Sequence, residues 1–267
     1  ASAYSIIGDT KNAELNYLEE LELEKSFFGE NDKIVAFTYQ NLGNVYSAAN
    51  QLKLAENYFL KSIFILKTFY GNNNADYAEC INNLAVVYKD LGYYTKAEPL
   101  YKEASELKKQ IFGENSLNYQ KSLIYQAIFY YEIGDIKKSE DLFLESYRLQ
   151  KANLNKDTFI DFVEILNGIG TRYSLRLDYS NAEKFYFESL ETIDKYIGKE
   201  NTLYTNSLIK IGMLYSNQSQ YPQSRTYFNE ASKILINLKK YYTSEHVFVL
   251  EALASGYRYE AKYDLSE

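Results

Sequence analysis

A tyrosine recurs along this chain at an almost constant spacing, and this period restricts the possible folds more than any other feature. Five of the six intervals are 42 residues and one is 43, between Tyr4, Tyr46, Tyr88, Tyr130, Tyr173, Tyr215 and Tyr257. Self-similarity at a period of about 20–50 residues is typical of repeat architectures, in which each unit covers the apolar flank of the next. We therefore predict a linear array of repeats rather than one central core.

Small and aromatic residues keep fixed distances from this tyrosine. Three residues before it, every side chain is small: Ala1, Gly43, Ala85, Ala127, Gly170, Gly212 and Ala254. Nine residues after it, every side chain is again small: Ala13, Ala55, Ala97, Ser139, Ala182, Ser224 and Ser266. Four residues further on, the position is aromatic wherever it is present: Tyr17, Phe59, Tyr101, Phe143, Tyr186 and Phe228. The pattern predicts two antiparallel helices per repeat, A and B, which approach at the small residues while an aromatic ring packs beside them.

Glycine and short polar residues mark the predicted loops. The B helices are predicted to end at residues that tolerate a left-handed C-cap: Gly29, Gly71, Gly113, Asn155 and Gly198. Side-chain acceptors that can cap the next A helix follow at Asn31 and Asp32, Asn73 and Asn74, Asn115 and Ser116, Asp157 and Thr158, Asn201 and Thr202, and Thr243 and Ser244. The turn between A and B is marked in several repeats by glycine, as at Gly92 and Gly134.

Insertions and prolines are rare in the chain. The one inserted residue lies between Asn155 and Ile169, so we expect it in the loop or first turn that opens an A helix. The two prolines, Pro99 and Pro222, are predicted near the starts of B helices, where a missing N–H matters least. Long stretches without proline favour an all-α fold.

Composition excludes several classes of function. The chain is 46% hydrophobic and 24% charged, and no apolar run approaches the ~18 residues of a membrane span. A net charge of −7 argues against nucleic acid, since phosphate binding depends on lysine and arginine. The single cysteine cannot form an intramolecular disulfide, which is compatible with a reducing compartment, so we expect a cytoplasmic protein.

Candidate catalytic residues are few. Cys80 lies early in a predicted A helix and is interpreted as a buried structural thiol, and His246 is the only histidine. One cysteine and one histidine support neither a zinc site nor a Cys–His pair, so no metal and no cofactor are expected. The glutamates Glu19, Glu20, Glu22 and Glu24 alternate with leucines on a B helix and are interpreted as a solvated face.

Two segments carry a resemblance to a known family. Residues 81–88, Ile-Asn-Asn-Leu-Ala-Val-Val-Tyr, and residues 91–104, with Gly92-Tyr93, Ala97-Glu98-Pro99-Leu100-Tyr101 and Ala104, resemble the tetratricopeptide repeat in its 42-residue form. That form occurs in kinesin light chains and in many bacterial multidomain regulators. The resemblance implies a right-handed superhelical α-solenoid, in which the A helices line a concave groove that receives a peptide or a helix.

The resemblance also implies a division of the chain. A single array is expected over residues 1–267, with a partial repeat at 1–30, complete repeats at about 31–72, 73–114, 115–156, 157–199 and 200–242, and a partial repeat at 243–267. The array begins and ends within a repeat, without the polar capping helix that a free array needs. We therefore expect a fragment of a longer chain.

Carried over to this chain, the groove positions on the A helices give the candidate binding residues. They are Gln40, Asn41, Asn44, Asn82, Asn83, Lys89, Tyr125, Ile128, Tyr131, Asn167, Thr171, Lys210 and Met213. Asparagine-rich positions in the first two complete repeats and aromatic ones in the third favour a linear peptide with a bulky apolar anchor. The family's clamp for C-terminal carboxylates uses clustered cations, whereas Lys89, Lys121, Lys210 and Arg258 lie in different repeats.

We therefore expect a protein-interaction scaffold that is not an enzyme, with a protein or peptide partner and neither membrane nor nucleic acid as ligand. A second hypothesis is that the chain is a sensor or inhibitory arm of a larger bacterial enzyme, such as a caspase-like peptidase or a kinase. The reason is that the chain begins and ends within a repeat. Other domains of the same polypeptide would then be its partners. A third, the binding of single-stranded nucleic acid, is disfavoured by the charge.

Overall fold

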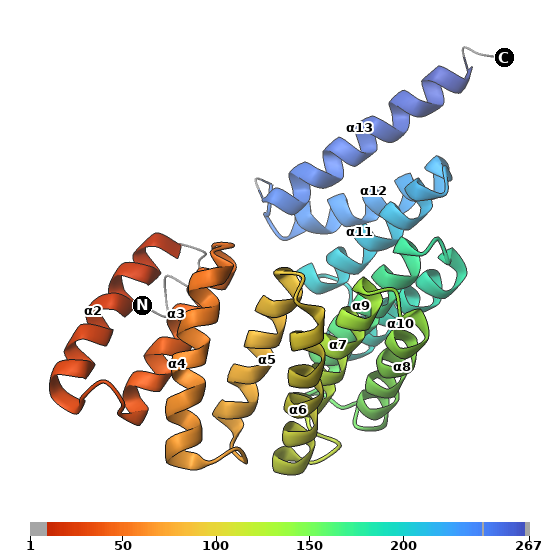
Figure 1. The fold of residues 1–267 in the computed structure, drawn as a ribbon. Helices are drawn as coiled ribbons and strands as arrows, with labels where there is room; N and C mark the ends of the chain where they lie inside the picture. Colours follow the sequence, from red (N-terminus) through yellow and green to blue (C-terminus); the bar gives the residue numbers. More distant parts are fainter. Residues whose placement is uncertain (1–9, 242, 265–267) are drawn as a thin grey trace. The chain divides into compact units, whose positions relative to one another are not determined.

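The computed structural model describes residues 10–241 and 243–264, so the predicted positions Ala1, Tyr4 and Ser266 lie outside it. The described residues form twelve α-helices (Figure 1). The A helices are α3 (Lys33–Ala48), α5 (Ala75–Asp90), α7 (Leu117–Glu132), α9 (Phe159–Leu175), α11 (Thr202–Asn217) and α13 (Ser244–Asp264). The B helices are α2 (Thr10–Phe28), α4 (Leu52–Tyr70), α6 (Tyr94–Phe112), α8 (Ile136–Ala152), α10 (Tyr179–Ile197) and α12 (Tyr221–Asn237). The prediction of an all-α chain of alternating A and B helices is confirmed.

The helices pack in sequential pairs. Helix α3 packs on α4, α5 on α6, α9 on α10 and α11 on α12, and the B helix of a repeat also packs on the following A helix, as α4 does on α5. Neighbouring A helices touch as well, α5 lying between α3 and α7, and α11 between α9 and α13. The chain divides into two compact units, an N-terminal unit of Ala1–Leu149 and a C-terminal unit of Gln150–Glu267, each described separately below.

The predicted close approach of small and aromatic residues is found inside the helix pairs α3–α4, α9–α10 and α11–α12. A Cβ atom added to Gly43 would lie 2.7 Å from Cε1 of Phe59, whereas ordinary van der Waals contact begins at 3.4 Å. A Cβ atom added to Gly212 would lie 2.8 Å from Cε1 of Phe228, and the Gly212 carbonyl oxygen accepts a hydrogen bond from Oγ of Ser224 at 2.8 Å. The two small positions of a repeat therefore face each other, and the ring closes the space beside them.

The repeated tyrosine joins one repeat to the one before it. In three repeats its hydroxyl donates a hydrogen bond to the glutamate that follows the small residue of the preceding B helix: Tyr46 to Glu14 at 2.8 Å, Tyr130 to Glu98 at 2.9 Å, and Tyr215 to Glu183. The rings themselves are almost completely buried in the first two cases. A charge-assisted bond thus fixes the position of each of these A helices on the previous B helix.

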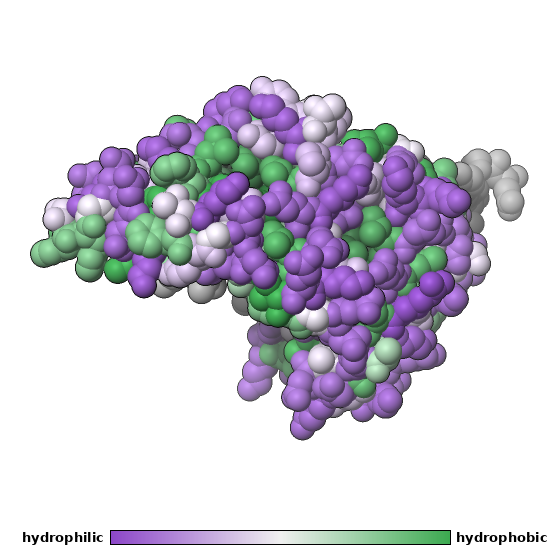
Figure 2. Space-filling model, turned by 60° about the horizontal axis from the view of Figure 1, so that its bottom comes forward, coloured by the Kyte–Doolittle hydropathy of each residue, from purple (hydrophilic) through white to green (hydrophobic). Residues whose placement is uncertain are grey.

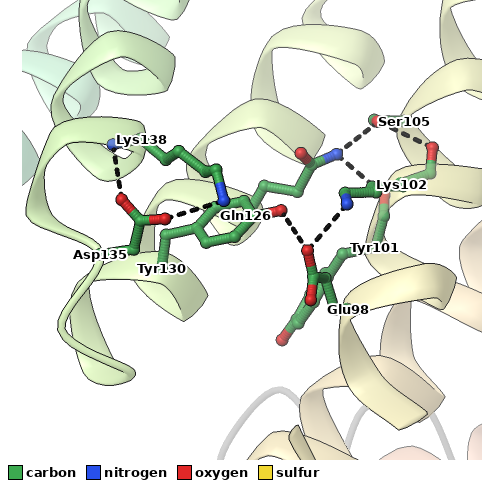
Figure 3. A network of polar contacts seen from close by, with 8 residues as sticks. All are labelled: Glu98, Tyr101, Lys102, Ser105, Gln126, Tyr130, Asp135 and Lys138. Carbon is green, nitrogen blue, oxygen red and sulfur yellow. Dashed lines mark hydrogen bonds and ion pairs between the residues drawn. The ribbon is translucent and has the colours of Figure 1, made fainter. Parts of the chain in front are cut away.

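One such bond belongs to a larger polar network in the N-terminal unit (Figure 3). Glu98 also accepts a bond from Nζ of Lys102 at 2.7 Å, and the ammonium of Lys138 lies 4.9 Å from the centre of the Tyr130 ring. Beside them the buried Gln126 donates from Nε2 to the Tyr101 carbonyl oxygen at 3.0 Å and to Oγ of Ser105. These contacts connect α6, α7 and α8.

Most of the predicted helix caps are confirmed. The side chains of Asp32, Asn74, Ser116 and Asn201 accept bonds from the first turns of α3, α5, α7 and α11. Left-handed backbone is found at the predicted B-helix ends, Gly29, Gly71, Gly113 and Gly198. The free backbone groups at these helix ends find hydrogen-bond partners in the adjoining residues, so the loops need only a few residues.

Around the insertion, the end of the B helix and the cap of the A helix depart from the prediction. Helix α8 ends at Ala152 rather than at Asn155, and Thr158 makes no cap bond because its hydroxyl donates to the Asn153 carbonyl oxygen at 2.9 Å. Helix α9 has 17 residues where α3, α5, α7 and α11 each have 16, and its additional residue lies in its first turn, where the insertion was predicted. Pro222 lies at the start of α12, whereas Pro99 lies inside α6.

The turn between A and B requires a left-handed residue four positions after the tyrosine. That residue is glycine at Gly92 and Gly134, but Asn50, Leu177 and Ser219 adopt the same backbone with φ near +60°. For Leu177, whose φ is 62°, a Cβ in this region is unfavourable by about 1–2 kcal/mol. The turn geometry is therefore imposed by the packing of the two helices, even on an unsuitable side chain.

Two glycines of α9 allow a direct test of the close approach. A Cβ on Gly170 would lie 2.7 Å from Cε1 of the buried Tyr186, whereas one on Gly168 would meet no atom within 4 Å. We expect Gly170→Leu to lower the free energy of unfolding by about 2 kcal/mol through overpacking. Gly168→Leu should raise it by about 0.5–1 kcal/mol through helix propensity alone. Urea unfolding followed by circular dichroism measures both, and equal effects would contradict the packing argument.

A reciprocal pair tests the turn. Leu177 is 70% exposed, so Leu177→Gly removes little packing and relieves the left-handed strain. The free energy of unfolding should rise by about 0.5–1 kcal/mol, and Gly134→Leu at the equivalent turn should lower it by a similar amount. Thermal unfolding of the two variants beside the parent chain measures the changes, and a loss of stability in Leu177→Gly would refute the strain.

Candidate functional site

The A helices of each unit share an outward surface, called here the A-helix face. It consists of four positions in each repeat: nine, five and two residues before the repeated tyrosine, and two residues after it. The side chains at these positions are exposed or half-buried in every described repeat from α3 to α11. The N-terminal unit contributes α3, α5 and α7, and the C-terminal unit contributes α9, α11 and α13. Because the other sides of an A helix pack on B helices, this is the surface on which it can meet another molecule.

An amide pair bridges two A helices in the N-terminal unit. Nδ2 of Asn83 on α5 donates to Oδ1 of Asn44 on α3 at 3.1 Å. Asn44 is exposed and Asn83 is half-buried, as are Gln40 and Asn41 one turn earlier on α3. The pair does not use the NH2 group of Asn44 or the carbonyl oxygen of Asn83, so a donor group and an acceptor remain for a ligand.

Asn82 does not belong to this surface, and its assignment as a binding residue is wrong. The residue is 0% exposed, and neither atom of its side-chain amide has a hydrogen-bond partner within the described residues. One residue of an α-helix turns by about 100°, so Asn82 points into the packing between helices while Asn83 points outwards.

Lys89 is already neutralised by the protein. Its half-buried ammonium contacts Asp90 at 2.9 Å on its own helix and Glu132 at 3.1 Å on α7. Burial disfavours the charge, but the two carboxylates outweigh it and raise the pKa of Lys89. The predicted groove lysine therefore joins α5 to α7, which leaves it less suited to a ligand.

Apolar surface lies on α7. Tyr125 is 41% exposed, and Ile128 and Tyr131 are half-buried, as is Val86 on the neighbouring α5. An aromatic ring that is held by one helix and exposed on one side offers contact area at low entropic cost. The amide pair and this apolar surface lie on the adjacent helices α3, α5 and α7 of one unit.

The A helices of the C-terminal unit carry different chemistry. Nδ2 of Asn167 on α9 donates to Oγ of Ser207 on α11 at 3.2 Å, while Oδ1 of Asn167 is buried without a partner in the described structure. Thr171 bonds to the hydroxyl of Tyr186 at 3.1 Å and is engaged in packing. Lys210 is half-buried, and Met213 is 43% exposed.

An apolar hollow on the outer side of the N-terminal unit was not predicted. It has a volume of about 270 Å³ and is lined by Glu30, Asn31, Tyr39, Asn57, Leu60, Lys61, Phe64 and Ile65. Phe64 is 64% exposed, and apolar side chains are visible on the end of the molecule that carries α2 and α4 (Figure 2). The sequence held a signal, because the positions equivalent to Phe64 are charged in the other repeats: Glu106, Arg148, Glu191 and Lys233.

The cysteine and the histidine are both engaged in structure. Cys80 is completely buried, with Sγ 3.7 Å from the Phe59 carbonyl oxygen, and burial raises the pKa of its thiol to about 12. The buried His246 lies between Oγ of Ser232 at 3.2 Å and the Tyr241 carbonyl oxygen at 3.0 Å. Within residues 10–241 and 243–264, no cluster of three potential metal ligands is found. None of the helices in those ranges has the length and apolar character to cross a membrane.

These features define a repeat protein of paired helices with an outward A-helix face. Residues 76–152 match a family model described as tetratricopeptide repeat, and residues 38–63 match a second model with the same description. The chain is a tetratricopeptide repeat protein. No curated protein sequence matches it.

Solved structures with the same fold have little sequence identity to this chain. BtubC (BKLC) from P. vanneervenii is 13% identical, with a TM-score of 0.66 over 88% of this chain and 94% of that one. The apo form of the quorum sensor NprR from B. thuringiensis is 18% identical, with a TM-score of 0.62 over 93% and 67%. A Rap protein in complex with Competence and Sporulation Factor is 15% identical, with a TM-score of 0.60 over 98% and 74%. A putative kinesin light chain from Podosopora anserina is 12% identical, with a TM-score of 0.64 over 78% and 98%.

Proposed function

We propose that this chain is a protein-interaction scaffold that binds a peptide segment of a partner on its A-helix face. The observation that carries the proposal is the amide pair of Asn44 and Asn83 on the same unit as the exposed ring of Tyr125. Side-chain amides can bond both N–H and C=O of a peptide backbone, and the ring provides an apolar contact. A peptide segment with one bulky apolar residue fits both contacts: its backbone would bond to the amide pair, and its apolar side chain would pack on the ring.

The fold relatives support a peptide as the ligand. The similar Rap structure is a complex with Competence and Sporulation Factor, and another similar structure is NprR in complex with its cognate peptide NprX, with a TM-score of 0.55 and 15% identity. At such identities the likeness concerns the fold alone, so the residues that would contact a peptide here are argued from this chain.

The proposed scaffold carries out no reaction of its own. Cys80 is buried as a neutral thiol, and both ring nitrogens of His246 are used in bonds to Ser232 and Tyr241. The proposal places the chain in the cytoplasm, where a single reduced cysteine is ordinary.

The experiment is peptide selection followed by mutagenesis. Random dodecapeptides that bind the chain are selected, and the affinity of the best one is measured by fluorescence anisotropy for the parent and its variants. We expect the double change Asn44→Ala and Asn83→Ala, and separately Tyr125→Ala, to weaken binding by about 5–30-fold, because each removes contacts of about 1–2 kcal/mol. Circular dichroism checks that each variant is folded.

Phe64→Lys is the matched control, since it introduces at the outer hollow a charge that other repeats tolerate at this position. It should leave the affinity unchanged. If Phe64→Lys abolishes binding while the changes on the A-helix face have no effect, the peptide binds in the outer hollow and the proposal is wrong.

A further inference from the structure

The outer hollow of the N-terminal unit coincides with a break in the repeat pattern. Eleven residues before the repeated tyrosine, the repeat at 31–72 has Val35, whereas the four other complete repeats carry an aromatic residue: Tyr77, Tyr119, Phe162 and Tyr204. Fifteen residues after the tyrosine, it has Lys61, whereas the same four repeats carry glutamate: Glu103, Glu145, Glu188 and Glu230. One repeat therefore lacks both the ring and the carboxylate.

In the next two repeats the side chains at these two positions contact each other. The hydroxyl of Tyr77 donates a hydrogen bond to Glu103 at 3.0 Å, and that of Tyr119 donates one to Glu145 at 3.1 Å. Both rings are almost completely buried. A tyrosine thus reaches from the first turn of the A helix to the position on the B helix that Lys61 occupies in α4. Because Lys61 lines the hollow and valine is too short to reach it, we attribute the hollow to the missing ring.

The hollow has the size and the walls of a site for one aromatic ring. Its volume is about 270 Å³, whereas about 150 Å³ between apolar side chains is enough to hold benzene. The buried ring of Tyr39 and the exposed side chains of Leu60 and Phe64 are among its walls. Leu60 is 45% and Phe64 64% exposed, so a ligand can enter from outside. The next repeat has Lys102 and Glu106 at these two positions, so the apolar wall is particular to this repeat.

Polar groups around the hollow indicate which ring fits best. The ammonium of Lys61 lies 5.3 Å from the centre of the Tyr39 ring, and Glu30, Asn31 and Asn57 complete the lining. An ammonium is attracted to the face of an aromatic ring and can donate a hydrogen bond to a phenol oxygen. The hydroxyl that donates to glutamate in the next two repeats would here accept from lysine. A phenol ring therefore suits the hollow better than a purely apolar ring.

We propose that the outer hollow binds an aromatic side chain of a partner segment, with tyrosine preferred to phenylalanine. The ring of the partner takes the place that Tyr77 and Tyr119 fill from within the chain in their own repeats. The site is formed by α4, by Tyr39 and by the loop that follows α2, so it is separate from the A-helix face. The inference therefore goes beyond the proposed function and does not depend on it.

Two small probes test the ring site directly. p-Cresol has the ring and hydroxyl of a tyrosine side chain, and toluene has the ring of phenylalanine. Each is titrated into the chain, and methyl NMR follows Leu60 and Ile65 at the hollow, with Ile211 of the other unit as a reference. We expect p-cresol to shift the first two signals with a dissociation constant of about 1 mM, as is usual for so small a ligand. Toluene should bind about 3–10-fold more weakly, and Lys61→Met should remove this difference.

Three variants separate the ring site from general effects. Phe64→Lys changes an exposed wall and should weaken p-cresol at least 5-fold without affecting the fold. Val35→Tyr combined with Lys61→Glu restores the pair of the next two repeats and should abolish both shifts. Lys67→Met, a change of another exposed lysine of α4 outside the lining of the hollow, should alter neither affinity. If p-cresol shifts neither Leu60 nor Ile65, or if Phe64→Lys leaves its affinity unchanged, the site is refuted whether or not the double variant folds.

Peptide selection then tests the partner. Random dodecapeptides that bind the parent chain but not Phe64→Lys are collected. We expect them to contain tyrosine, to lose at least 10-fold in affinity when it is replaced by alanine, and to be displaced by p-cresol. Peptides without an aromatic residue would refute the proposal. Light scattering of the chain alone should show monomers, and dimers that p-cresol dissociates would mean that the ring comes from a second copy, contrary to the proposal.

The two binding proposals fail independently. Peptides of the hollow should be insensitive to Tyr125→Ala and to the double change Asn44→Ala and Asn83→Ala. If these changes have no effect on any peptide while p-cresol binds as expected, the proposed function fails and the ring site stands. If p-cresol does not bind while the A-helix face does bind its peptide, the ring site fails and the scaffold function stands.

Discussion

The close crossing of A and B helices at a glycine or alanine is the contact on which the rest of the structure depends. Gly43, Gly170 and Gly212 lie so close to an aromatic ring that even one added methyl group would overlap with it. This contact holds the two helices of a repeat together. The hydrogen bond from the repeated tyrosine to a glutamate of the preceding B helix then holds each such repeat on the one before it. The A helices are thereby held side by side within each unit, and their outward surface has a defined pattern of side chains.

Polar groups on the A helices are used in two ways. Some are paired across helices, as Lys89 is with Glu132, Asn83 with Asn44 and Asn167 with Ser207. Others are buried without a hydrogen-bond partner in the described structure, namely both amide atoms of Asn82 and the carbonyl oxygens of Gln120 and Asn167. Because an unpaired buried polar group is unfavourable in a folded protein, these side chains stabilise the fold less than apolar residues of the same size would.

Sequence reasoning recovered the features that depend on local chemistry. The period, the small and aromatic positions and caps such as Asp32 and Asn74 each follow from a backbone requirement that few residue types meet. It failed where tertiary packing determines which side chain is buried. Asn82 and Asn83 have the same side chain, yet only the rotation of α5 determines which is buried. Gln126 is buried where other repeats have Leu42 and Leu84, and it is tolerated because Tyr101 and Ser105 on another helix accept its amide. The candidate site was therefore predicted as a set of helices rather than as individual contacts.

The bond between tyrosine and glutamate has a consequence for how the protein is made. In each case the two residues are only 32 positions apart, and the bond between Lys89 and Glu132 spans 43. Contacts of such short sequence separation close small loops, which favours rapid folding. A repeat can therefore complete its contacts with its predecessor soon after it leaves the ribosome, before the following repeat has been synthesised. The same period that sets the shape of each helix pair thus allows the protein to fold in the order in which it is translated.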